Sequence, residues 1–205
     1  MHVARLVPRL ATVALALTTA CGGAKAKAEA DITTADSAVA AVAPDAGKVL
    51  PYEVQQLSSA VTAARDTLAK GDYAAAQAAV ADIPARAQEL AAKLPAKRAE
   101  LTAQLDTLRF ALLKNLAAIQ TKVDQFARSR RLPMGLDAAK LATVKETLVS
   151  APQEWARIEA EIQAGELDSA YGKGTVLRLK VSESLEAVGL VSSEAEWHNL
   201  KLPPK

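Results

Sequence analysis

The sequence predicts an all-α protein, an antiparallel bundle of about five helices in which two helical hairpins flank one long central helix. Three observations support this fold class: Ala and Leu supply 72 of the 205 residues, aromatic residues number only seven, and apolar residues recur at alternating steps of three and four. Ala and Leu are strong helix formers, whereas β-sheet proteins are richer in aromatic and β-branched residues. A single cysteine also excludes a disulfide-built domain.

The first twenty residues have the pattern of an export signal. Arg5 and Arg9 precede an apolar run over residues 10–17, and small residues follow up to Cys21. A basic start, a short apolar stretch and small residues before a cleavage point are typical of secretory signals. The run is too short to span a bilayer, which takes about 20 residues of helix. We therefore expect residues 1–20 to be a removable signal peptide.

The tetrapeptide Thr-Thr-Ala-Cys at residues 18–21 resembles the lipobox of bacterial lipoproteins, in which signal peptidase II cuts before a cysteine that carries diacylglycerol and an acyl chain such as palmitate. Lipoboxes usually have Leu three residues before the cysteine, whereas here Leu17 lies four before it. The resemblance implies lipid attachment at Cys21, on the periplasmic side of the cell envelope. Gly22 resembles the outer-membrane sorting residue of enteric lipoproteins. The alternative is an ordinary signal that leaves Cys21 as a free thiol.

Residues 21–50 are expected to be a lipid anchor followed by a flexible linker. Ala, Gly, Ser, Thr and Asp dominate this segment, and no stripe of large apolar side chains runs through it. Such a segment buries too little apolar surface to order itself, beyond a transient helix in its Ala-rich part. A flexible coil of this length has an end-to-end distance of about 30 Å.

Residues 51–190 are expected to be the helical bundle domain. Its first helix begins near Pro51 and ends at Gly71, and Asp72 is placed to cap the next helix. The apolar seam of the first helix has the heptad spacing of a coiled coil and consists of Val54, Leu57, Val61, Ala64 and Leu68.

The second helix is expected over residues 73–94 and the long central helix over residues 96–132. Pro84 must kink or divide the second helix, because proline lacks the amide hydrogen of its own turn. Pro95 suits the first turn of the central helix. Arg128, Arg130 and Arg131 lie near the carboxyl end of that helix, where cations interact favourably with its dipole.

The fourth and fifth helices are expected between the N-cap Asp137 and Gly165, and over residues 167–188. Residues 191–205 are expected to be a poorly ordered tail. A shift of 94 residues places Leu68 on Ile162 and Gly71 on Gly165, so the two hairpins share a turn pattern. A duplication and a shared heptad constraint both explain this match. The region around residues 131–137, with its hairpins, also resembles Ala-rich exported bundle proteins of bacteria, which implies this fold but no activity.

The residue types needed for catalysis or metal binding are scarce. After removal of the signal peptide, His198 is the only histidine and Cys21 is assigned to lipid, so no zinc, haem or copper site and no Ser-His-Asp or Cys-His set can be assembled. Glycine-rich residues 172–174 lack the spacing of a phosphate-binding loop and suit close helix packing or a helix break. The carboxylates Glu159, Glu161, Glu166 and Asp168 are interpreted as a solvated helix end and a cap. The sequence thus predicts neither an enzyme nor a bound cofactor.

Charge argues against nucleic acid as a partner, because without residues 1–20 the chain has 23 basic and 23 acidic residues. The cluster of Arg128, Arg130 and Arg131 is the one candidate contact for anionic lipid, lipopolysaccharide or peptidoglycan, and dipole-matched surface arginines are the alternative. We expect a non-catalytic, lipid-anchored envelope protein with a structural or interaction role, whose partner is another protein or an envelope polymer. The alternative is a periplasmic carrier of a small apolar ligand, which needs a pocket of about 300 Å³ beside Trp155.

Overall fold

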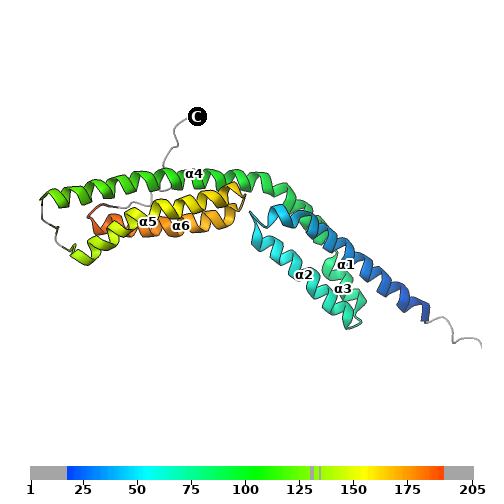
Figure 1. Cartoon of the computed structure of the whole chain (residues 1–205). Helices are drawn as coiled ribbons and strands as arrows, with labels where there is room; N and C mark the ends of the chain where they lie inside the picture. Colours follow the sequence, from blue (N-terminus) through cyan, green and yellow to red (C-terminus); the bar gives the residue numbers. More distant parts are fainter. Residues whose placement is uncertain (1–17, 130–131, 134, 192–205) are drawn as a thin grey trace, which may run out of the picture. The chain divides into compact units, whose positions relative to one another are not determined.

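The all-α prediction is confirmed. A computed structural model describes residues 18–129, 132–133 and 135–191, with side chains from residue 23, and these residues form six helices and no strand (Figure 1). The helices are α1 Thr18–Ala46, α2 Pro51–Ala69, α3 Tyr73–Val80, α4 Ile83–Ser129, α5 Ala138–Gln163 and α6 Leu167–Ala187.

The helices belong to two compact units. Unit 1 contains the chain up to Pro44 and residues 52–91, and its described part is α1, α2, α3 and the start of α4. Unit 2 contains residues 45–51 and the chain from residue 92, and its described part is the rest of α4 with α5 and α6. Figure 1 shows the helices of each unit running side by side.

The expected flexible linker over residues 21–50 is wrong for its described side chains, because residues 23–46 belong to α1. One side of α1 is buried at steps of four, three and four, through Ala28, Ile32, Ala35 and Val39. The Asp36 carboxylate also pairs with Arg65 of α2 at 2.8 Å. This segment is therefore an integral helix of unit 1.

Small side chains explain why the apolar pattern of α1 was missed. Ala28 and Ala35 are fully buried, yet each contributes little apolar surface of its own. Alanine has the highest helix propensity and lets neighbouring helices approach closely, so packing orders a segment without large apolar side chains.

The two prolines at residues 84 and 95 have effects that differ from one another. Pro84 falls at the division between α3 and α4, in the first turn of α4, where a missing amide hydrogen leaves no bond unmade. The expectation that Pro95 begins the central helix is wrong, because α4 runs through it and spans 47 residues. Leu94 and Leu101, which lie before and after Pro95, are both buried. Their packing offsets the main-chain hydrogen bond that Pro95 cannot donate, so the helix continues.

The two hairpin turns share several main-chain hydrogen bonds, in agreement with the 94-residue match. Gly71 N donates to Leu68 O at 2.9 Å, and Gly165 N donates to Ile162 O at 3.0 Å. Both glycines have positive φ, 84° and 78°, a conformation that other residues rarely adopt. The next residue of each turn donates to the carbonyl five positions earlier, over 3.3 Å in the first turn and 2.9 Å in the second.

The core of unit 2 lies between α4, α5 and α6 and contains Trp155, which is 6% exposed. Gly174 of α6 lies against this core, since a Cβ on it would lie 3.2 Å from Leu108 Cδ1. A Cβ on Gly172 would meet nothing within 4 Å. The close-packing interpretation is thus confirmed for Gly174 alone, and neither glycine breaks α6.

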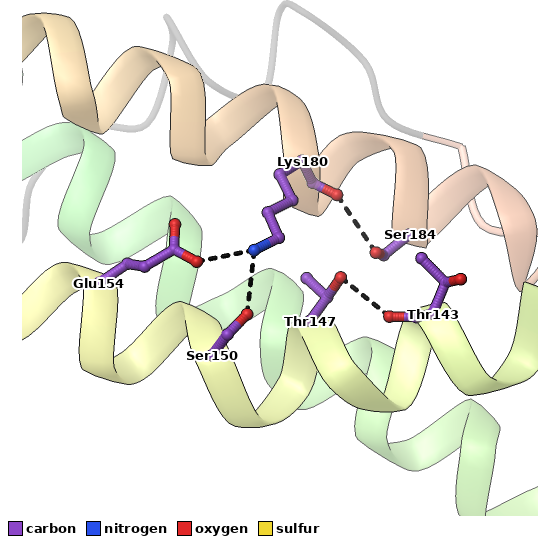
Figure 2. Close-up of polar contacts among 6 residues, drawn as sticks. All are labelled: Thr143, Thr147, Ser150, Glu154, Lys180 and Ser184. Carbon is purple, nitrogen blue, oxygen red and sulfur yellow. Dashed lines mark hydrogen bonds and ion pairs between the residues drawn. The ribbon is translucent and has the colours of Figure 1, made fainter.

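Polar side chains lie between α5 and α6 beside the apolar core (Figure 2). Thr147 is buried and donates to the Thr143 carbonyl of its own helix at 3.1 Å. Lys180 crosses from α6 to α5, where its Nζ lies 2.7 Å from Glu154 Oε1 and donates to Ser150 Oγ at 3.0 Å. Every buried side-chain nitrogen and oxygen of the described residues has a partner.

Residues 1–17 of the signal peptide expected over residues 1–20 lie outside the described residues, as do all but the first residue of the tail expected over residues 191–205. Within the described part, none of the helices combines the length and the apolar character needed to cross a bilayer.

Candidate functional site

Two of the sequence-predicted sites fall partly outside the described residues. The structure does not describe the side chain of Cys21, nor any atom of Arg130 and Arg131. Arg128 is described: it is exposed in the last turn of α4, and its Nε donates to the Asp124 carbonyl at 3.2 Å. Its guanidinium therefore lies at the carbonyl end of the helix, where the dipole favours a positive charge.

A groove of about 320 Å³ lies beside Trp155, between α4 and α5. Its apolar lining is Leu105, Trp155 and Ile162, and its polar lining is Asp106, Arg109, Glu159 and Gln163. Trp155 Nε1 donates to Glu159 Oε1 at 2.9 Å, and the same oxygen lies 3.3 Å from an Arg109 nitrogen. The indole is thus held by a carboxylate that a guanidinium also neutralises.

A second groove, of about 390 Å³, lies between α4 and α6. Leu108 and Tyr171 give it apolar surface, while Glu100 and Arg178 stand among its polar residues. Glu100 is engaged within α4, because its Oε1 accepts from Lys97 at 2.9 Å and from Gln104 at 3.2 Å. Both grooves have the size of small-ligand sites.

The segment before α2 binds the turn between α5 and α6, a contact that sequence reasoning missed. Lys48 Nζ donates to the Ala164 carbonyl at 2.9 Å and lies 3.8 Å from Glu166 Oε1. The Lys48 carbonyl in turn accepts from Asp168 N at 3.2 Å. One lysine therefore satisfies a carbonyl at the end of α5 and an amide at the start of α6, two groups that helix ends leave without partners.

The acidic residues near this turn are engaged in separate contacts. Glu161 pairs with Lys173 and accepts from Ser169 Oγ at 3.0 Å. The Lys173 ammonium, with the Ser169 hydroxyl, lowers the pKa of the Glu161 carboxyl below its ordinary value of 4.5. Glu166 stands at the N-cap position of α6, but its side chain makes no cap hydrogen bond. The Lys48 carbonyl supplies an acceptor at the start of α6 instead.

The described residues contain no group of three His, Cys, Asp or Glu side chains that could hold a metal ion. His198 lies outside the described residues. The polar side chains that the structure does bring together are Trp155, Glu159 and Arg109 at the first groove. Lys48 makes the second such contact, at the turn between α5 and α6.

Comparison of the chain with protein-family models, with curated proteins and with solved structures gave no match.

Proposed function

We propose that this chain is a non-catalytic, lipid-anchored protein of the cell envelope that binds another envelope protein or an envelope polymer such as peptidoglycan. The anchor is Cys21, and the anchored side is the periplasmic face, in the outer membrane. The proposal is supported by the export-signal pattern of residues 1–20 and the lipobox-like residues that precede the cysteine.

One structural observation carries the role of the anchored domain. Ala28, the first buried residue among the described side chains of α1, follows Cys21 by only seven positions. Seven extended residues span at most about 25 Å, so a lipid on Cys21 holds unit 1 close to the membrane surface. A protein held in this way acts on partners within reach of the membrane.

Outward-facing apolar side chains support a binding role. Phe110 and Leu113 of α4 are 41% and 57% exposed, and Val176 and Leu179 of α6 are 67% and 52% exposed. Each pair is spaced by three residues, so its members share one helix face. Apolar side chains grouped on an exposed face are typical of protein interaction surfaces.

The anchor is tested by the intact mass of the protein purified from membranes. We expect Cys21 to carry diacylglycerol and an acyl chain, and a Cys21→Ser variant to leave the membrane fraction. An unmodified thiol at Cys21 would refute the anchoring.

Crosslinking in intact cells tests the interaction role. A chain that remains without adducts under several growth conditions contradicts that role.

A periplasmic carrier is the second candidate, and the groove beside Trp155 favours it, since Leu105 and Ile162 give that groove apolar surface. In a Trp197→Phe background, decanol should shift the emission of Trp155 at saturable, micromolar concentrations. An Ile162→Trp variant, which would fill the groove, serves as the negative control once its own emission is subtracted. An emission shift that does not saturate with decanol would rule out the carrier function.

A further inference from the structure

The groove beside Trp155 continues along α4 into a further hollow of unit 2. That hollow has a volume of about 410 Å³, lies beside the turn between α5 and α6, and has Lys48 and Arg98 in its lining. Ile162 and Gln163 of α5 line both the groove and the hollow. The two are therefore parts of one elongated depression, which we call the α4–α5 groove.

One face of α4 forms a continuous wall of the α4–α5 groove. The polar residues that α4 contributes to it are Arg98, Thr102, Asp106 and Arg109. Steps of four, four and three positions place these side chains on the same face of a helix. At 1.5 Å per residue, α4 rises by about 12 Å from Arg98 to Asp106.

The end of the groove near the α5–α6 turn carries two cations. Arg98 Nη2 lies 3.1 Å from Asp45 Oδ1, and Lys48 Nζ donates to the Ala164 carbonyl at 2.9 Å. A guanidinium and an ammonium each have several N–H donors, so both cations keep donors for a further anion. Asp45 is the one carboxylate in the lining here, while Glu166, 3.8 Å from Lys48 Nζ, stands outside it. This end therefore favours a carboxylate group of a ligand.

The end near Trp155 carries an excess of negative charge. Asp106 and Glu159 line it together with a single cation, Arg109. Glu159 is already engaged, because its Oε1 lies 3.3 Å from Arg109 and accepts from the Trp155 indole at 2.9 Å. Asp106 is exposed, and no described residue forms an ion pair or a side-chain hydrogen bond with it. The Asp106 carboxylate is thus free to accept from an ammonium group of a ligand.

The middle of the groove has the chemistry to bind a peptide group. The exposed side-chain amide of Gln163 makes no hydrogen bond with the described residues, and an amide can both donate to and accept from a main chain. Leu105 and Ile162 supply apolar surface beside it. An extended chain covers about 3.3 Å per residue, so four residues span about 13 Å. This length matches the rise of α4 between the two charged ends.

We propose that the α4–α5 groove binds a short extended peptide of about four residues with free ends. The peptide ammonium lies at Asp106, and the peptide carboxylate lies at Arg98 and Lys48. The inference goes beyond the proposed function, because it requires no lipid anchor. The charged ends of this ligand also distinguish it from the apolar ligand of a carrier.

Isothermal titration calorimetry of the full chain with tetra-alanine tests the proposal. We expect saturable binding of the peptide with free ends. Acetylation of its amino end and amidation of its carboxyl end should each weaken binding at least about tenfold, because each removes a charge-assisted contact. Dialanine, which is too short to join the two ends, should bind more weakly by a similar factor.

Three results would overturn the proposal. The first is the absence of saturable tetra-alanine binding, and the second is an affinity that either of the two end blocks leaves unchanged. The third is saturable binding of decanol without binding of tetra-alanine, which would favour the carrier instead.

Paired variants assign the two ends of the peptide. Asp106→Asn should weaken the binding of free tetra-alanine about tenfold and leave the affinity for the acetylated peptide unchanged. Arg98→Gln should do the same with the amidated peptide as its insensitive partner. Glu183→Gln and Arg157→Gln remove exposed charges outside the groove and should keep the parent affinity. Helix content by circular dichroism should be equal in all four variants, and equal losses for free and blocked peptides would contradict the assigned ends.

Discussion

Lys48 and Ala164 are 116 positions apart in the sequence, and their contact fixes the connection before α2 to the end of α5. The Lys48 ammonium donates to the Ala164 carbonyl at 2.9 Å, while the Lys48 carbonyl accepts from Asp168 N. Gly165 lies under the lysine stem, since a Cβ there would be 3.8 Å from Lys48 Cδ. The side chain and the main chain of one residue thereby cap two consecutive helices.

Replacing Lys48 with Met should lower the free energy of unfolding by about 0.5–1 kcal/mol, because the ammonium is partly exposed and water replaces much of its interaction. Chemical denaturation monitored by circular dichroism measures the change. Lys93→Met, at an exposed position of α4, is the control and should change stability by less than about 0.5 kcal/mol. Equal effects of the two variants would show that the Lys48 contact contributes nothing to stability.

Ile32→Ala tests the packing of α1. Ile32 is 5% exposed, so truncation should lower the free energy of unfolding by about 2–4 kcal/mol through lost burial and a cavity. Ala30→Ser, at an exposed position of the same helix, should cost less than about 0.5 kcal/mol. If residues 23–46 were a flexible linker, the two variants would have the same stability as the parent protein.

The glycines of α6 give a matched pair of substitutions. Gly172→Ala should raise stability by about 0.5–1 kcal/mol, because the added methyl meets open space and alanine favours the helix. Gly174→Ala should be less stable than Gly172→Ala by about 1 kcal/mol, since its methyl pushes against Leu108 Cδ1. Thermal unfolding of both variants measures the difference, and a Gly174→Ala protein as stable as Gly172→Ala would contradict the close contact.

The pKa of Glu161 predicts a contribution to acid sensitivity. The carboxyl has a lower pKa in the folded protein than in the unfolded chain, so its stabilising effect is fully present above the unfolded value. That effect is lost as the pH falls below about 5 and through the lower, folded pKa. Glu161→Gln should therefore show a flatter stability profile between about pH 5 and pH 3. Glu183→Gln, which removes an exposed carboxylate from α6, should keep the profile of the parent protein.

Large apolar side chains and turn residues made much of the fold predictable from sequence. The heptad seams placed α2, α5 and α6, and the caps Asp72 and Asp137 accept amide hydrogen bonds at 3.1 Å and 2.8 Å. These features depend on residues close in sequence, so local pattern was sufficient to find them. The helical match between the two hairpins was likewise visible in the sequence.

The candidate sites were only partly predictable. Trp155 was named from sequence only as the neighbour of a possible ligand pocket. Its contact with Glu159 and Arg109 joins two helices whose register the sequence does not specify. Arg128 was identified from its position at a helix end. The Lys48 contact had no local signal, because its partners lie more than a hundred residues away in the chain.

The sequence by itself determined the helical class, the two glycine turns and the seams of large apolar side chains, because these are set by local propensity and spacing. Tertiary packing alone decided that α1 is a buried helix, that α4 continues through Pro95 and that Lys48 caps the α5–α6 turn. In each of these cases the stabilising contact comes from a neighbouring helix or a distant segment. A small side chain or a single polar group predicts a contact only when the position of that neighbouring segment is known.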